Sequence, residues 1–114
     1  MNINKRWLNF VLSDDGSFDQ LIIKTEQAFK HKLICIDDEG RYIASADLDE
    51  FSIRVIDKVD RLSELLCDED YTLKITIHSE RYFNHEFEGY IKKILHENGI
   101  QWKRCVWTPD KLAH

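Results

Sequence analysis

The sequence has few of the residues that interrupt a chain. Four glycines and one proline occur among 114 residues, which excludes a Gly- or Pro-rich linker and a glycine-rich phosphate loop. No apolar run approaches the about 20 residues that span a bilayer, and the first residues do not read as a signal peptide. We therefore expect a single soluble, cytoplasmic domain over residues 1–114.

Cysteine is also scarce. Cys35, Cys67 and Cys105 are odd in number and far apart, a pattern that suits neither a disulfide framework nor a zinc site. The five histidines show no H-E-x-x-H spacing, and no cysteine is placed to complete a metal site with them. We expect reduced cysteines, no metal and no cofactor.

Catalytic motifs are missing as well. The sequence contains no G-x-S-x-G, no P-loop and no dinucleotide fingerprint. We therefore assign no catalytic residue and do not expect an enzyme. A small enzyme with an unrecognised site stays an alternative, because His78, His85 or a cysteine would then have to meet other groups in a cleft.

What the chain does contain is enough apolar surface for a core. Apolar residues make up 43% and charged residues 32%, which indicates a folded rather than a disordered chain. Alternating or short apolar runs predict strands at residues 7–12, 33–36, 41–46, 71–77 and 100–108. Apolar residues at helical spacing predict helices at residues 18–31 and 79–98.

Local signals mark several of these boundaries. Ser17 and Gln20 have the spacing of a capping box at the start of the first helix. The sequence Asn98-Gly99 is typical of a helix C-terminus. A four-residue loop at 37–40 would close a hairpin between the second and third strands.

Residues 47–66 support two interpretations. Asp47 with Glu50 has capping-box spacing, and apolar residues then step by three and four through Leu66, which favours one long helix. Residues 51–55 also alternate and are rich in β-branched side chains, which indicates a strand followed by a shorter helix from Asp57. We take the long helix as the prediction.

These elements give the order β-α-β-β-α-β-α-β. They predict a single-domain α+β sandwich of ferredoxin-like type, with a mixed or antiparallel sheet of about five strands and helices mainly on one face. The fold class alone selects no function.

Charge is unevenly distributed. The chain has a net charge of −5, yet residues 37–70 hold twelve Asp or Glu and only four Lys or Arg. Helix N-termini and turns favour such residues for capping and solubility alone. The alternative is a docking surface for a basic protein. On that hypothesis the partner-binding residues are Asp37, Asp38, Glu39, Asp47, Asp49, Glu50, Asp68, Glu69, Asp70 and Trp107.

The function expected from these features is protein binding. A small acidic domain without catalytic motifs is typical of an immunity protein that neutralises a basic bacterial toxin or nuclease domain by direct contact. The acidity argues against direct nucleic-acid binding. Besides the enzyme, the alternatives are a phage-type inhibitor that mimics nucleic acid and a module that self-associates through an exposed strand edge.

Overall fold

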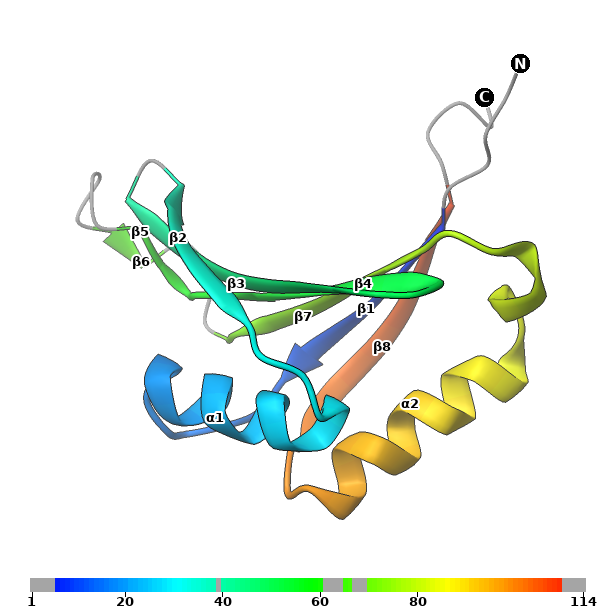
Figure 1. Ribbon diagram of the computed structural model, residues 1–114. Coiled ribbons are helices and arrows are strands. Elements are labelled where there is room, and N and C mark those ends of the chain that lie inside the picture. Colours follow the sequence, from blue (N-terminus) through cyan, green and yellow to red (C-terminus); the bar gives the residue numbers. More distant parts are fainter. Residues whose placement is uncertain (1–5, 39, 61–64, 67–69, 110–114) are drawn as a thin grey trace.

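The computed structural model describes residues 6–38, 40–60, 65–66 and 70–109. Six antiparallel strands form one sheet in the order β2-β3-β4-β7-β1-β8, and both α-helices lie against the same face of it (Figure 1). This confirms the α+β class, with one strand more than expected. The strands are β1 (Arg6–Leu12), β2 (Ile34–Asp38), β3 (Arg41–Leu48), β4 (Phe51–Ile56), β7 (Thr72–Ile77) and β8 (Trp102–Pro109). The other elements are α1 (Phe18–Phe29), α2 (His85–Glu97), the 3₁₀ helix η1 (Glu80–Tyr82), and the separate pair β5 (Val59–Asp60) and β6 (Leu65–Leu66).

The topology is a ferredoxin-like arrangement with an inserted hairpin. β1 lies between β7 and β8 and is antiparallel to both, so β7 and β8 run parallel and α2 connects them as a split β-α-β unit. With β2, β3 and the separate pair β5 and β6 set aside, the remaining order of strands and α-helices is β-α-β-β-α-β. β2 and β3 extend the sheet beyond β4.

The core lies between the sheet and the two helices. Every second residue of β1 and β7 points toward the helices, and Leu8, Phe10 and Ile75 are fully buried there. Leu21 of α1 and Ile91 of α2 meet them from the other side. The alternation predicted for residues 71–77 is thereby confirmed. Neither α-helix in the described ranges has the length and apolar content required to cross a membrane.

The long helix predicted for residues 47–66 is wrong. β3 continues to Leu48, and β4 follows after a two-residue turn. Ile53 and Val55 are fully buried on the helix-facing side of β4, opposite Ile75 and Leu73 of β7. Pairing with two neighbouring strands therefore overrides the helical spacing. The strand alternative is correct for residues 51–55, but β5 and β6 replace its shorter helix.

One boundary of the last helix also differs from the prediction. The last helix begins at His85 rather than Ser79, because the Asn84 side chain caps it by accepting a hydrogen bond from the Phe87 N–H at 2.9 Å. Its predicted end is confirmed, since Asn98 is the C-cap and Gly99 has a φ of 72°.

The β2–β3 hairpin is tighter than predicted. Asp37 and Asp38 belong to β2, and Asp38 pairs with Arg41. The predicted four-residue loop is therefore wrong at its first two positions. Glu39 lies outside the described residues.

A register shift between β1 and β8 changes which side chains of β8 share a face of the sheet. Simple alternation places Trp102 with Arg104 and Val106, away from Cys105 and Trp107. The shift between Val11 and Leu12 of β1 instead brings Trp102 opposite Leu12, and its ring packs edge-on against Phe10 at 5.7 Å. Sequence periodicity does not reveal such a bulge.

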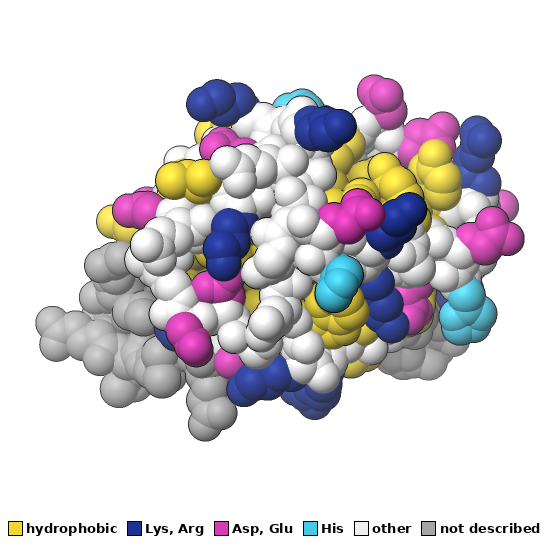
Figure 2. Space-filling model, turned by 90° about the horizontal axis from the view of Figure 1, so that it is seen from below, with side chains coloured by type: hydrophobic (Ala, Val, Ile, Leu, Met, Phe, Trp, Pro, Cys, Tyr) yellow, Lys and Arg dark blue, Asp and Glu magenta, His cyan; other side chains and the backbone are white. Residues whose placement is uncertain are grey.

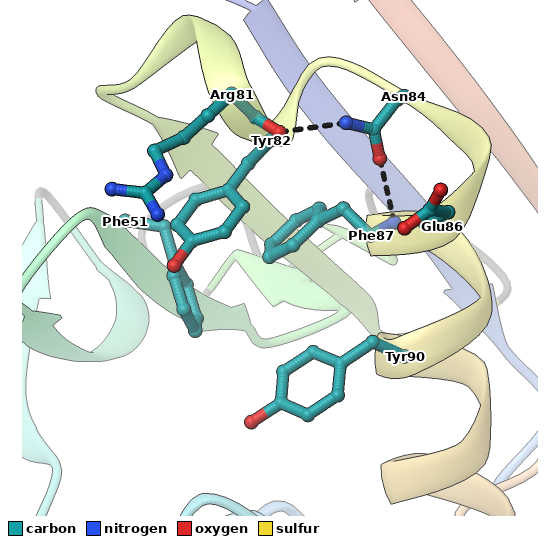
Figure 3. A pocket seen from close by; sticks show the side chains of 7 residues that line it. All are labelled: Phe51, Arg81, Tyr82, Asn84, Glu86, Phe87 and Tyr90. Carbon is teal, nitrogen blue, oxygen red and sulfur yellow. Dashed lines mark hydrogen bonds between the residues drawn. The ribbon is translucent and has the colours of Figure 1, made fainter.

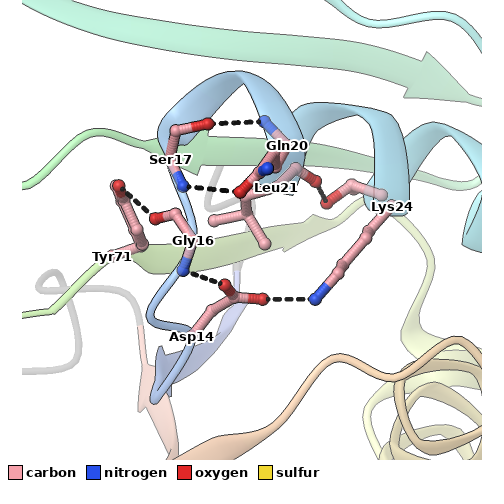
Figure 4. Close-up of polar contacts among 8 residues, drawn as sticks. Asp14, Gly16, Ser17, Gln20, Leu21, Lys24 and Tyr71 are labelled. Atoms are coloured by element: carbon pink, nitrogen blue, oxygen red, sulfur yellow. Dashed lines mark hydrogen bonds and ion pairs between the residues drawn. The ribbon is translucent and has the colours of Figure 1, made fainter.

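The turn between β1 and α1 is held by polar contacts (Figure 4). The predicted capping box is confirmed, because Ser17 and Gln20 exchange side-chain to backbone hydrogen bonds. Asp14 accepts a hydrogen bond from the Gly16 N–H at 2.7 Å and pairs with Lys24 at 3.0 Å. A Cβ on Gly16 would come within 2.7 Å of the Gln20 side-chain oxygen, so a larger residue here would displace the Gln20 side chain from its capping hydrogen bond.

Asp14 makes the stability of this turn dependent on pH. Burial raises the pKa of its carboxyl, but the Gly16 N–H and Lys24 outweigh burial and the pKa is lowered. The stabilisation is therefore present above the ordinary aspartate pKa and disappears as the pH falls through the folded-state pKa. We expect Asp14→Asn to cost about 1.5 kcal/mol at pH 7, and urea unfolding should show this difference shrinking in acid.

The adjacent Asp15 provides the control for this prediction. It is exposed, so Asp15→Asn should change the free energy of unfolding by less than about 0.5 kcal/mol. An equal cost for both variants, or a cost for Asp14→Asn that does not vary with pH, would contradict the assigned role.

Candidate functional site

The described acidic residues divide between two ends of the sheet. Asp47, Asp49 and Glu50 lie around the β3–β4 turn, whereas Asp37 and Asp38 lie beside the opposite end of β3. β3 has eight residues, which at about 3.3 Å each span roughly 25 Å. The two groups therefore form separate surfaces.

The third acidic segment lies mostly outside the described residues, which include Asp70 but neither Asp68 nor Glu69. Asp70 precedes β7 and pairs with Lys103 at 3.0 Å. Because Ile56 pairs with Thr72 and also with Ile43, Asp70 belongs to the same end of the sheet as the β2–β3 hairpin.

The β3–β4 end contains a hollow beside its acidic turn. Its volume is about 450 Å³, and its walls come from β4, η1 and the first turns of α2. We call it the aromatic hollow. Its lining residues are Phe51, Arg81, Tyr82, Asn84, Glu86, Phe87 and Tyr90 (Figure 3).

The floor of the aromatic hollow is a packed ring cluster. Phe87 is buried, stacks on Tyr82 at 5.0 Å, and meets Phe51 edge-on at 5.2 Å. Tyr90 lies 6.3 Å from Phe87 and is 55% exposed. The hollow therefore has a rigid apolar base and one exposed tyrosine at its open side (Figure 3).

A second cavity of about 330 Å³ adjoins the first between α1 and α2. Phe51 and Tyr90 line both, and Phe29 and Ile94 belong to the second cavity only. On the helix side of the molecule, hydrophobic side chains gather among acidic and basic ones (Figure 2). The two cavities meet at the Phe51 and Tyr90 side chains and together form a groove with a mixed polar and apolar lining.

One acidic side chain, Glu86, lines the aromatic hollow, and further acidic residues lie in the adjoining β3–β4 turn and in η1. Glu50 Oε1 lies 3.6 Å from the Arg81 guanidinium, which also lies 5.8 Å from the Tyr82 ring. Glu50 Oε2 is enclosed and accepts no hydrogen bond from the described part of the chain. Glu80 and Glu86 are exposed nearby. Carboxylates thus outnumber the single cation, Arg81, on the lining and in the adjoining turn.

The sequence prediction contained only part of this site. It named Asp47, Asp49 and Glu50, but it missed Tyr82 and Tyr90. A helix assumed to begin at Ser79 places Phe83, Phe87 and Tyr90 in one buried stripe. The signal that could have separated them is Asn84, a favourable N-cap residue immediately before the true helix.

Contacts within the fold explain the position of Trp107, one of the partner-binding residues predicted from the sequence. It lies half-buried against the core, and its indole N–H donates to Glu88 Oε1 at 2.7 Å. Glu88 also pairs with Lys92 at 2.7 Å, and Lys92 followed by Trp107 lowers the pKa of the Glu88 carboxyl. The Trp107–Glu88 contact therefore ties β8 to α2.

A serine–histidine contact exists but is poorly arranged for nucleophilic catalysis. Ser52 Oγ lies 2.8 Å from His78 Nε2 and donates its proton to Asp47 at 2.7 Å. A hydroxyl has one proton, so in this arrangement His78 donates to Ser52 rather than activating it as a base. Asp47 and His78 are also exposed, where water competes for both.

The described thiols are not activated. Burial, followed by the charge of Glu88, raises the pKa of Cys105 to about 11. Burial and then Asp19 raise the pKa of Cys35. Thiolates are the reactive form, so both side chains stay protonated near neutral pH.

The helix-free face of the sheet carries several basic side chains. By strand register, Arg54, Lys74 and Arg104 lie on this face. Of the described residues on it only Trp7 is aromatic, and Lys74 Nζ already lies 5.1 Å from its ring centre. Single-stranded nucleic acid is held by several free rings along a strand path, so this face offers a weak platform for it.

The described residues hold no group of three or more His, Cys, Asp or Glu side chains arranged to bind a metal ion. Comparison of the whole chain with protein-family models, with curated proteins and with solved structures gives no match.

Proposed function

We propose that this chain is a protein-binding module that holds a basic segment of its partner in the aromatic hollow. The observation that carries the proposal is the combination in one place of an exposed Tyr90, a packed aromatic floor and nearby carboxylates. Tyrosines at the centre of a pocket are typical anchors of protein interfaces.

An arginine or lysine of the partner fits this chemistry. Its cation would lie over the exposed face of Tyr90, an interaction worth about 0.5–2 kcal/mol. Glu86 at the rim offers a charge-assisted hydrogen bond.

The partner class that we propose is a basic toxin or nuclease domain, which the chain would neutralise as an immunity protein does. The net charge of −5 and the acidic turn would accelerate encounter with such a partner. The described Ser52, His78 and cysteine side chains are not arranged for catalysis, which favours binding over an enzymatic role.

A basic peptide tests the aromatic hollow directly. We expect a blocked Arg/Lys-rich peptide, titrated into isotope-labelled protein, to shift the NMR signals of Tyr82, Glu86 and Tyr90 in a saturable way. An acidic peptide of equal length should leave them unchanged. The matched variant Asp37→Asn/Asp38→Asn removes carboxylates at the other end and should bind the basic peptide equally well. Shifts centred on Asp37 and Asp38 instead would refute the proposed site.

A growth assay tests the partner class. If a gene next to this one encodes a basic protein, its expression alone should stop growth of a bacterial host, and co-expression of this chain should restore it. The two purified proteins should then form a complex whose affinity falls with added salt. Continued growth arrest together with no complex would exclude the immunity role for that pair.

A further inference from the structure

β2 is an edge strand that the described part of the chain leaves uncovered. It pairs with β3 on one side only, and all five of its residues are exposed. Ile34 and Ile36 are 70% and 52% exposed, on the helix-free face of the sheet. Apolar side chains beside unpaired backbone groups form a template for another strand.

The other edge of the same sheet shows how such an edge is usually protected. β8 carries Lys103 and Arg104, ends at Pro109, and contains a register shift against β1. Charges, proline and bulges all discourage pairing with another strand. The pairing of β2 with β3 is regular throughout. β2 contains no proline, lysine or arginine, and its two charged residues, Asp37 and Asp38, are both at its C-terminal end.

The sequence through β2 is complementary to itself in the antiparallel direction. Lys32 precedes the strand, Ile34 and Ile36 form its middle, and Asp38 ends it. Ile34, Ile36 and Asp38 alternate with Cys35 and Asp37, so they share one face of β2. Lys32 lies two residues before the strand, and continuing the same alternation places it on that face. The order on that face is therefore basic, apolar, apolar, acidic.

We propose that β2 pairs antiparallel with β2 of a second copy of this chain, about a two-fold axis at Cys35. In this register Ile34 of each copy lies opposite Ile36 of the other. Lys32 of each copy lies opposite Asp38 of the other. A centre of four isoleucines is thus flanked by two ion pairs, and the two sheets become one continuous sheet with all helices on the same side.

Neighbouring registers lack this match. Centring the axis on Ile36 puts Asp38 opposite Ile34 of the other copy, and centring it on Ile34 puts Lys32 opposite Ile36. Both place a charge against an isoleucine on the helix-free face, whereas the axis at Cys35 places a charge against an apolar side chain only on the helix-facing side, where Asp37 lies opposite Leu33. Register is set by such side-chain patterns, so the axis at Cys35 is selected. On the helix-free face, Ile36 also lies beside the buried Ile43 of β3, whereas Ile34 lies beside Ser45.

Disulfide cross-linking can show which residues of the two β2 strands lie opposite each other. Residues directly opposite in antiparallel strands have Cα atoms about 4.5 or 5.5 Å apart, within the about 4.4–6.8 Å that a disulfide requires. A Cys67→Ser/Cys105→Ser variant, which keeps Cys35 alone, should form a covalent dimer with copper–phenanthroline as oxidant. Oxidation should be faster at pH 9 than at pH 7, because the thiolate reacts.

Cysteine pairs that differ in register provide the control. With Cys35, Cys67 and Cys105 all replaced by Ser, neither Ile34→Cys nor Ile36→Cys alone should form a dimer efficiently. An equal mixture of the two should cross-link, since only then do the cysteines lie opposite each other. Equal cross-linking in all three samples would indicate random collision and overturn the proposed register.

A charge exchange tests the same pairing without cysteine chemistry. Sedimentation of the unmodified chain should show a monomer–dimer equilibrium. Lys32→Asp or Asp38→Lys alone should weaken the dimer at least about tenfold, because like charges then face each other. The double variant should return the dissociation constant to within about threefold of the original, because each pair is restored with reversed sign.

These experiments test the dimer independently of the proposed function. A chain that stays monomeric at every concentration, or a double variant no better than the single ones, would overturn the dimer. Neither result affects the aromatic hollow, which lies around the β3–β4 turn at the other end of β3. In the dimer, Asp38 serves self-pairing rather than capture of a basic partner.

Discussion

Phe10→Ala is expected to lower the free energy of unfolding by about 3–5 kcal/mol, the usual cost of removing a buried phenylalanine. Phe10 is fully buried in β1, which has neighbouring strands on both sides, and its ring packs edge-on against Trp102 at 5.7 Å. Its loss would leave a cavity at the centre of the core. Urea unfolding followed by far-UV circular dichroism would measure the change.

The adjacent residue supplies the control. Val11 follows Phe10 in β1 but points to the helix-free face, where it is only half-buried. Val11→Ala should therefore cost less than about 1 kcal/mol. Equal losses for the two variants would mean that the two faces of β1 are buried to the same degree, which would contradict the one-sided placement of the helices.

Most of the fold could be predicted because local signals agree with burial. β7 alternates cleanly since one of its faces meets the helices, and α1 begins at a capping box that the structure contains. The prediction for residues 51–56 was wrong because their apolar residues fit both a helical and a strand period. Long-range pairing of β4 with β3 and β7 decided between them, and such pairing leaves little trace in a local window.

The candidate site was less predictable than the fold. The sequence identified the acidic residues but not their positions, because the path of β3 separates Asp38 from Asp49. Tyr82 and Tyr90 come together only through the break between η1 and α2. A strand length and a helix break, rather than composition, therefore determine which charges accompany which aromatic rings.

Tyr90→Ala is expected to weaken binding of the basic peptide at least about tenfold, which corresponds to about 1.4 kcal/mol. The ring lines both cavities of the groove, and its exposed face is the one on which a cation would lie. Because more than half of the side chain is exposed, the free energy of unfolding should change by less than about 1 kcal/mol. Calorimetric titration and urea unfolding would measure the two quantities separately.

Two matched variants identify the cause of that loss. Tyr90→Phe keeps the aromatic face and should retain most of the affinity, whereas loss with phenylalanine would assign binding to the hydroxyl instead. Ile23→Ala removes a side chain of nearly equal exposure, 54%, from α1 outside the groove. It should leave peptide binding unchanged. If Tyr90→Ala binds the peptide as tightly as Ile23→Ala, the aromatic hollow is not the binding site, because its most exposed ring would then contribute nothing.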